Sequence, residues 1–410
     1  MRRRSEDARC RSFSVVNAVA SCSSELTAHR SACSNLGAGT QLNTRIARRL
    51  AFGAASGVVA ALVAEAVRPR GGKMDLLDWD HIAALARRRL REQPLGTARL
   101  QAVAAGYNQL AAGVREPLLE AVGGLPPGVR LPEFEALDRS GWLDLNVRIL
   151  RQAMEPLNEV GRVPNSLLAD LGRAGVNRYV ALLLDFLSRR VLGQFDPQLL
   201  GKEPLAQALY LVEPNVAEWQ RRESLPGDDL RRWLILHEMT HAWQFAAHPW
   251  LRDHLNQGLT QLIEAATAPR RRGVGQLVAF TIGGRGQWSS LRRMQATMTL
   301  VEGYGNLIMN LVGSRTLSSF DLLEAAYQRR SGQRSALDLL IWRLTGLELK
   351  LKQYRVGEAF ARAVYDRYGM AVLNRAWESP QSLPRPEELR DFERWYRRIK
   401  AGTSEVPSRL

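Results

Sequence analysis

Apolar residues recur along most of the chain at the three- and four-residue spacing that is typical of amphipathic helices. The pattern begins near Trp79 and predicts helices over 82–90, 100–110, 142–160 and 176–191. Further along, it predicts helices over 251–266, 289–312, 317–330, 336–345, 347–368 and 387–400. Residues 123–128, Gly-Gly-Leu-Pro-Pro-Gly, interrupt the series because Gly and Pro favour turns. We therefore expect a mainly α fold.

Only one segment reads as a strand. Residues 208–212 are apolar, short and followed by Glu213-Pro214, which is typical of a buried strand that ends at a turn. Residues 192–197 predict a turn, and the Gly- and Arg-rich stretches 269–275 and 282–286 predict exposed loops. The β content is therefore expected to be small.

Residues 1–73 differ from the rest of the chain because they have no usable periodicity. We interpret them as a disordered leader or as the product of an over-long reading frame, with Met74 as an alternative start and residues 74–410 as the domain. Within the leader, residues 50–67 are apolar, but they are fewer than the ~20 that span a bilayer comfortably. The expectation is a cytoplasmic protein, and the alternative is a membrane tether through residues 50–67.

Charge and cysteine content narrow the class of protein. The formal charge is +16, and half of it comes from the first 73 residues, which hold 12 basic and 4 acidic side chains. The other half is spread over the remaining chain, so we do not expect a nucleic-acid-binding surface. All three cysteines, Cys10, Cys22 and Cys33, precede residue 34. A metal site in the body of the chain must therefore use His, Asp or Glu.

The segment 231–245 carries the strongest chemical motif, His237-Glu238-Met239-Thr240-His241, in a run without Gly or Pro. In a helix, two histidines four residues apart lie on one face, where both imidazoles can bind one Zn²⁺ ion. Glu238 lies beside them and can hold a water molecule. Ile235, Met239, Ala242 and Ala246 form an apolar stripe roughly opposite the histidines, and Asp228 and Asp229 fit the N-cap and first turn. The pattern predicts a buried helix that presents His237 and His241 to a cleft.

A catalytic zinc site needs a third protein ligand, and three residues are candidates. His248 would lie ~10.5 Å further along the same helix than His241, too far to share an ion, and Pro249 disfavours helical geometry there. Glu264 lies on the next predicted helix. Glu302 follows His241 by 61 residues (302 − 241) and lies at the edge of a stripe of core positions, where a carboxylate is costly unless it is paired. Glu302 is the favoured ligand.

The surroundings of Glu302 support this choice. Asn306, one turn later, shares its side of the helix and could hold a ligand histidine from behind. Gly303 and Gly305 weaken the helix, which suggests that another backbone approaches closely there. Tyr304 or Tyr354 could donate a hydrogen bond to the oxyanion that develops in hydrolysis.

Several motifs together resemble the zincin-like metallopeptidase family of HExxH hydrolases, which are associated with biosynthesis of the deazaflavin coenzyme. These motifs are 237–245, 249–252, 301–303, 188–194, 346–354 and 373–377, and the resemblance covers about residues 75–400. It implies a zincin-like helical fold with little β structure, His237, His241 and Glu302 as zinc ligands, and Glu238 as the general base. The chain departs from the family at Tyr304, where members usually carry His, and at Asn306 and Asn310, where they usually carry acids.

The sequence therefore predicts a zinc-dependent hydrolase, most naturally a metallopeptidase that acts on a peptide or amide substrate. A zinc-bound water would attack the carbonyl, with Glu238 as general base and Tyr304 as the first candidate oxyanion donor. The departures at Tyr304 and Asn306 motivate an alternative, a non-catalytic scaffold or binding protein that a metal ion stabilises.

Overall fold

The computed structural model describes residues 75–403 except 76, 91, 161–166, 197–207, 268–283 and 333–346, all within the unit Ala66–Leu410. The predicted leader with its apolar segment 50–67, the loop 269–275 and the helix 336–345 lie outside these residues. In the part that is described, no helix is both long and apolar enough to cross a membrane.

Helices dominate the described chain, as the sequence predicts. They are α2 (Trp79–Leu90), α3 (Thr97–Val122), α4 (Arg139–Val160), α5 (Leu167–Ser188), α6 (Glu213–Glu223), α7 (Gly227–Ala247), α8 (Trp250–Thr267), α10 (Gly284–Thr316), α11 (Phe320–Gly332), α13 (Leu347–Asn374) and α14 (Phe392–Thr403), with short 3-10 turns η1 (Arg375–Trp377) and η2 (Glu388–Arg390). The predicted break falls at the end of α3, where Gly123 and Gly124 have φ of 91° and 90° that side chains rarely adopt. The predicted loop 282–286 is partly wrong, because α10 already begins at Gly284.

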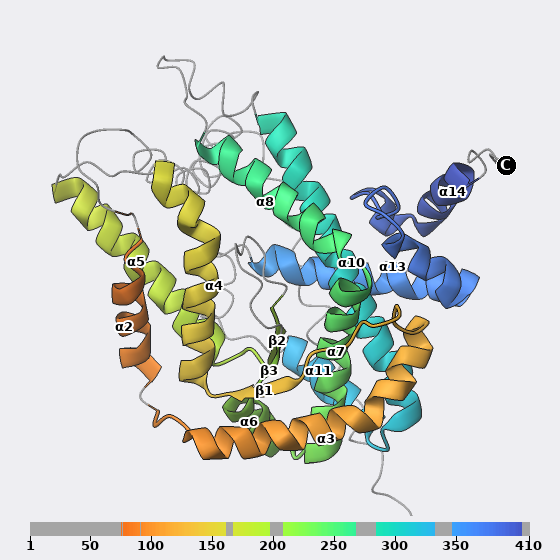
Figure 1. Ribbon diagram of the computed structural model, residues 1–410, viewed down its shortest axis with the longest axis horizontal. Coiled ribbons are helices and arrows are strands. Elements are labelled where there is room, and N and C mark those ends of the chain that lie inside the picture. Colours follow the sequence, from red (N-terminus) through yellow and green to blue (C-terminus); the bar gives the residue numbers. More distant parts are fainter. Residues whose placement is uncertain are drawn as a thin grey trace, which may run out of the picture. The chain divides into compact units, whose positions relative to one another are not determined.

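A small sheet lies among these helices (Figure 1). Its strands are β1 (Phe134–Leu137), β2 (Gly193–Phe195) and β3 (Leu209–Val212), in the order β1-β3-β2. The predicted strand at 208–212 is confirmed as β3, the central strand, which pairs in parallel with β1 and antiparallel with β2. The predicted turn over 192–197 is wrong, since β2 occupies residues 193–195. Three residues are too few for an alternating pattern to show in the sequence.

The helix that carries the His-Glu-x-x-His motif is buried along nearly its whole length. Ile235, Met239 and Ala242 of the predicted stripe are buried, and so are Trp233, Leu236 and most other side chains of α7. This helix contacts α3, α8, α10 and β2, so it is surrounded rather than half-covered (Figure 1). The predicted apolar stripe is present, but α7 buries apolar side chains on almost all of its other sides as well.

Two glycines bring the backbones of α10 and α13 into contact. A Cβ atom placed on Gly303 would collide with backbone atoms of Gly357 and Glu358, and one placed on Gly357 would collide with the backbone of Thr299. The expected close approach at Gly303 therefore occurs, with α13 as the second backbone. The crossing fixes α10, and with it Glu302, against the rest of the core.

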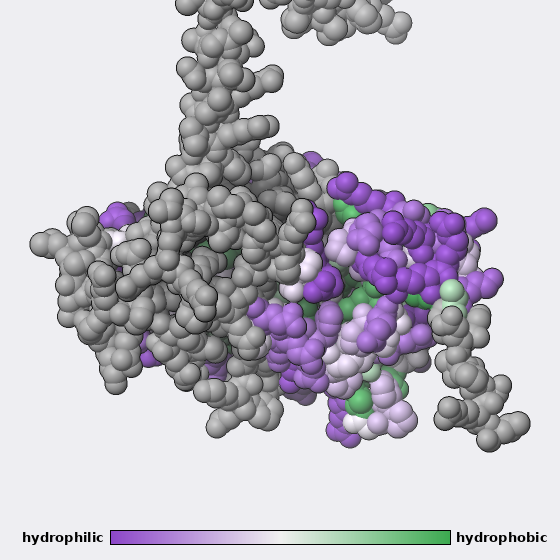
Figure 2. All heavy atoms as spheres, turned by 90° about the horizontal axis from the view of Figure 1, so that it is seen from above, coloured by the Kyte–Doolittle hydropathy of each residue, from purple (hydrophilic) through white to green (hydrophobic). Residues whose placement is uncertain are grey.

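The described surface that faces the viewer in Figure 2 is mostly hydrophilic, and hydrophobic side chains show only in small separate areas. Large exposed apolar side chains among the described residues are Tyr179, Leu182 and Leu322. Scattered single residues of this kind are normal on a globular protein and indicate no particular partner.

Candidate metal centre

The first turn of α7 is held by the turn between α10 and α11. Asp228 and Asp229 lie in this first turn, as predicted, although the N-cap residue is Pro226. The Asp229 Oδ2 atom accepts hydrogen bonds from the Ser318 hydroxyl and the Ser319 backbone N–H, each 3.1 Å long. Burial alone would raise the pKa of Asp229, but these hydrogen bonds lower it. Asp229 thus ties the first turn of α7 to the turn between α10 and α11.

His237, His241 and Glu302 converge at one point. The two Nε2 atoms lie 3.1 Å apart, and the Glu302 Oε2 atom lies 3.6 Å from that of His237 and 3.5 Å from that of His241. One ligand atom from each residue lies within 4.8 Å of the other two. The side chains remain 19%, 10% and 23% exposed, respectively. Two imidazoles from α7 and a carboxylate from α10 therefore face one partly open spot.

His241 and Glu302 shift each other's pKa. Burial alone would lower the pKa of His241, but the adjacent Glu302 carboxylate outweighs it and raises the pKa to about 9. Burial alone would raise the pKa of Glu302, yet His241 and His237 hold it well below its usual range. The arrangement favours a positive charge between two imidazoles and a carboxylate. A bound cation supplies such a charge.

Gln244 orients the ring of His241. Its Nε2 atom donates a 3.0 Å hydrogen bond to the Val301 carbonyl, so its Oε1 atom is the acceptor that lies 2.9 Å from the His241 Nδ1 atom. His241 therefore carries a proton on Nδ1, and its Nε2 atom faces Glu302. This is the tautomer that binds a metal ion through Nε2.

Asn306 does not orient a histidine ring as Gln244 does. This corrects the expectation that Asn306 would hold a ligand histidine. Its amide nitrogen donates to the Glu358 Oε2 atom at 3.5 Å. The Nδ1 atom of His237 is buried and has no hydrogen-bond partner among the described residues. Gly305 leaves room for both rings, because a Cβ atom there would lie 3.0 Å from the His241 Cε1 atom and 3.3 Å from that of His237.

The Glu238 side chain lies between its own helix, α7, and β2, an edge strand of the sheet. Its side chain is buried, and a Cβ atom on Gly193 of β2 would lie 2.5 Å from its Oε1 atom. Burial raises the pKa of the Glu238 carboxyl, while the nearby His237 and His241 and a hydrogen bond from the Phe195 backbone oppose that rise. A carboxyl group with a raised pKa next to a metal-type cluster is suited to exchange protons.

With this geometry established, comparison with known proteins identifies the family. A sequence model described as zincin-like metallopeptidase matches residues 77–396. The chain belongs to the zincin-like metallopeptidase family. No curated protein matches the chain. A crystal structure from Chloroflexus aurantiacus, described as that of a candidate hydrolase with a novel fold, matches with 34% identity and a TM-score of 0.60, and the match covers 79% of this chain and 99% of that one. Family and relative together support a hydrolase, and the donor set of two imidazoles and one carboxylate fits the metal that a zincin implies.

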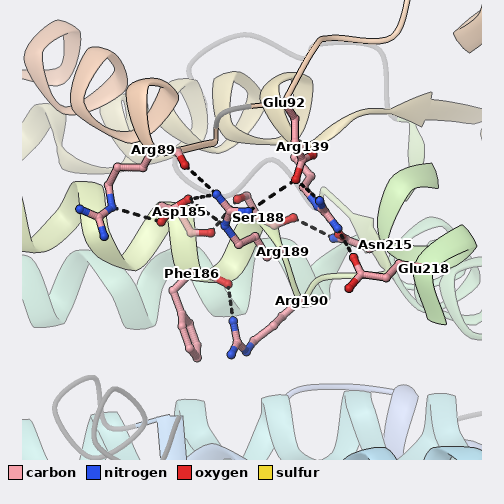
Figure 3. A network of polar contacts seen from close by, with 10 residues as sticks. All are labelled: Arg89, Glu92, Arg139, Asp185, Phe186, Ser188, Arg189, Arg190, Asn215 and Glu218. Atoms are coloured by element: carbon pink, nitrogen blue, oxygen red, sulfur yellow. Dashed lines mark hydrogen bonds and ion pairs between the residues drawn. The ribbon is translucent and has the colours of Figure 1, made fainter. Parts of the chain in front are cut away.

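In this zincin-like protein a polar network holds the segment that leads into β2. Asn215, at the start of α6, donates to the carbonyls of Ser188 and Val191 at 2.7 and 2.6 Å. The Asn215 Oδ1 atom accepts from the Arg139 Nε atom at 2.6 Å, and Arg139 also pairs with Glu92 and Glu218 (Figure 3). The network fixes the end of α5, and thereby places Gly193 against Glu238.

Tyr304 does not lie where its predicted role as oxyanion donor requires. Its hydroxyl donates a 2.7 Å hydrogen bond to the Asn374 Oδ1 atom, and its ring is fully buried and stacked on Trp243. Residues i and i+2 of an α-helix project about 200° apart, so Tyr304 points away from the side of α10 that carries Glu302. The zincin-like site therefore takes no hydroxyl from Tyr304.

The other predicted candidates have distinct positions. His248 ends α7 and packs between Trp243 and Trp377, outside the group of three. Glu264 lies in α8 and Tyr354 in α13, but the structure does not describe their side chains. The fold brings together four of the predicted residues: His237, His241, Glu238 and Glu302.

Sequence reasoning missed two residues of the site: Gln244 and Gly193. Gln244 stands three residues after His241, and this spacing on a helix is a signal that could have found it. Gly193 gives no such signal, because its importance depends on a contact with α7 that only the fold creates.

Proposed function

We propose that this chain is a zinc-dependent hydrolase that cleaves amide bonds, most naturally those of peptides. The observation that supports it best is the convergence of His237, His241 and Glu302 within 4.8 Å, with the buried Glu238 on the next position of the same helix. Two imidazoles and one carboxylate are a ligand set of catalytic zinc sites that leave a position open.

The roles divide among these residues as follows. His237, His241 and Glu302 hold the ion, which when bound acidifies a water molecule and polarises a carbonyl group. Glu238 accepts a proton from the attacking water as the water oxygen bonds to the carbonyl carbon. It then delivers that proton to the amine nitrogen as the carbon–nitrogen bond breaks. Its raised pKa supports both halves of this exchange.

The edge of the sheet supports a peptide as substrate. β2 is one of the two outer strands of the sheet, so among the described residues its other edge has no strand partner. An exposed edge can pair with an extended peptide through backbone hydrogen bonds. Because Glu238 lies against Gly193 of this strand, a peptide bound there would lie close to the proposed base.

A second candidate is the metal-stabilised scaffold. It is favoured by the location of the ligands on two different core helices, α7 and α10, since a shared ion would link them whatever its chemistry. The cytoplasmic location, the tether through 50–67 and the deazaflavin association stay predictions.

Two measurements test the proposed function. Purified wild-type protein should contain about one zinc ion per chain, and the His237→Ala variant should lose it. A defined peptide mixture, digested and read by mass spectrometry, should be cleaved by the wild type and not by Glu238→Gln, which should retain zinc. A protein without zinc at neutral pH contradicts the proposal. A zinc-bound protein whose cellular role survives Glu238→Gln supports the scaffold instead.

A further inference from the structure

A cavity separate from the group of His237, His241 and Glu302 lies where α8, α10, η1 and α14 meet the connecting segment 378–385. Its volume is about 620 Å³, and none of those three residues is among its described lining residues. It is lined on the α10 side by Thr297, five residues before Glu302. The two side chains therefore project about 140° apart around the helix. A molecule in this cavity would contact a side of α10 other than the one that carries Glu302.

The connecting segment that forms one wall of the cavity is held by α14. The Arg398 Nη1 and Nη2 atoms donate to the carbonyls of Gln381 and Leu383 at 2.6 and 2.8 Å. Arg398 is itself fixed by two hydrogen bonds of 2.8 Å to the carboxylate of the buried Glu388. A paired arginine and carboxylate of this kind have a defined geometry. The wall is therefore in place before any ligand binds.

The cavity carries more positive than negative charge. Its lining includes four arginines and one carboxylate: Arg293, Arg375, Arg385, Arg398 and Glu378. Arg375 pairs with Glu378 at 3.4 Å, and Arg398 pairs with Glu388. Arg293 and Arg385 make no ion pair with a carboxylate in the part of the chain that the structure describes. Four arginines and two carboxylates leave two unmatched positive charges (4 − 2) at the cavity.

Neutral groups orient Arg293. Its Nη1 and Nη2 atoms donate to the hydroxyls of Ser289 and Ser290 at 3.4 and 3.0 Å, which leaves its charge unchanged. His254 of α8 also lines the cavity. Burial lowers the pKa of His254, and the charge of Arg293 lowers it further. The imidazole is therefore neutral near pH 7, and the positive charge of the cavity comes from its arginines.

The remaining lining is largely apolar and includes Pro380, Leu383, Pro384 and Ile399. A cavity of this volume, with apolar walls and a few charged groups, is typical of a binding site for a small organic molecule. Guanidinium groups bind phosphate oxygens through paired hydrogen bonds. Two unmatched positive charges are complementary to the two negative charges of a phosphate monoester.

We propose that this cavity binds the phosphate monoester of a small organic molecule. Arg293 and Arg385 bind the phosphate, and the organic group lies against the apolar wall that contains Leu383 and Ile399. The ester is a ligand other than the peptide that the proposed function cleaves, because the cavity is separate from His237, His241 and Glu302. The site therefore does not depend on the proposed hydrolase activity.

Calorimetric titration of the full-length protein with phenyl phosphate tests the site. The double variant Arg293→Gln/Arg385→Gln should bind phenyl phosphate at least about tenfold more weakly, because it loses charged hydrogen bonds to the ligand. Both side chains are exposed, so the substitutions leave the core intact. Unchanged affinity in this variant, or no binding by the wild type up to about 10 mM, overturns the proposal.

Arg292→Gln/Arg390→Gln is the matched control. It removes two exposed arginines that do not line the cavity, so the net charge changes by the same amount. Its affinity should change less than about threefold, since only the long-range field of the protein differs. Equal weakening in the two double variants overturns the proposal, because it would indicate a general effect of charge.

Two further anions test the chemical class of the ligand. Benzoate has the same ring but one negative charge, and it should bind at least about tenfold more weakly than phenyl phosphate. Inorganic phosphate should also bind more weakly, because it leaves the apolar wall uncovered. Benzoate that binds as tightly as phenyl phosphate overturns the assignment to a phosphate, and inorganic phosphate that does so overturns the role of the apolar wall.

The His237→Ala variant separates this inference from the proposed function. It should bind phenyl phosphate like the wild type even though it loses zinc. If binding is lost in His237→Ala and kept in Arg293→Gln/Arg385→Gln, the ester binds at the metal, which overturns the cavity site and supports the metal centre. A wild type that binds phenyl phosphate but contains no zinc contradicts the proposed function and leaves the cavity site standing.

Vesicles distinguish a soluble ester from a lipid that carries the same phosphate group. The probe is co-sedimentation with phosphatidylcholine vesicles with and without phosphatidate. Binding that requires phosphatidate and is lost in Arg293→Gln/Arg385→Gln assigns the cavity to a lipid headgroup. Absence of such binding, with phenyl phosphate still bound, assigns it to a soluble ester.

Discussion

Gln244 and His241, one turn apart on α7, form a pair in which the amide oxygen of one accepts the Nδ1 proton of the other at 2.9 Å. The amide is itself fixed by the Val301 carbonyl, next to Glu302 on α10. The orientation of His241, one proposed metal ligand, is therefore tied to the backbone that positions Glu302, another proposed ligand.

Replacing Gln244 by Leu should weaken zinc binding by roughly 10- to 100-fold, because the ring of His241 loses the acceptor that sets its tautomer. Affinity can be measured by competition with a chromophoric chelator. Gln261→Leu on the exposed face of α8 is the control and should bind zinc like the wild type. Equal affinities for Gln244→Leu and Gln261→Leu would contradict this account.

Gly303→Ala should destabilise the fold by about 2–4 kcal/mol, because the new methyl group collides with the backbone of α13. Chemical denaturation measures the change. Gly113→Ala is a matched control in α3, where a Cβ atom would meet nothing within 4 Å. This variant should be more stable by roughly 0.5–1 kcal/mol, because Ala favours the helix. A neutral Gly303→Ala would show that the helices separate easily.

Gly193→Ala should impair catalysis more than folding. The added methyl group would lie 2.5 Å from the Glu238 Oε1 atom, so the carboxylate must move, and a misplaced base costs about 100-fold in rate. Zinc content should stay near the wild-type value. The denaturation midpoint should fall only slightly, because the Leu211 side chain, whose Cδ2 atom would lie 2.8 Å from the new methyl group, can shift by rotation. Loss of zinc in this variant would indicate a structural role for Gly193 instead.

Acid should destabilise the protein partly through His248. Burial lowers the pKa of this histidine to about 4, below the ~6.5 of an unfolded chain. The unfolded state therefore takes up a proton first, and stability falls as the pH drops from about 6.5 to 4. His248→Leu should remove roughly 1–2 kcal/mol of this loss, allowing for partial exposure. Denaturant titrations at pH 8 and pH 4.5 on both proteins measure it, and an unchanged pH dependence would contradict the explanation.

The sequence predicted the helical elements and the metal-type group because both have local signals. His237 and His241 are four residues apart, and the edge position of Glu302, with its neighbouring glycines, marked it before the fold was known. Tyr304 shows where this reasoning failed, since helix geometry alone separates it from Glu302 by about 200°. Gly193 depends on a contact between distant segments, which a single sequence does not encode as a pattern.

The contact between Gly303 and Gly357 also limits how this enzyme can be redesigned. Since the two helices touch through backbone, no side chain there can be enlarged or trimmed to change their separation. Glu302 and Glu358, each next to one of these glycines, are thus held at a set spacing. Redesign of the site must therefore start from side chains outside this crossing.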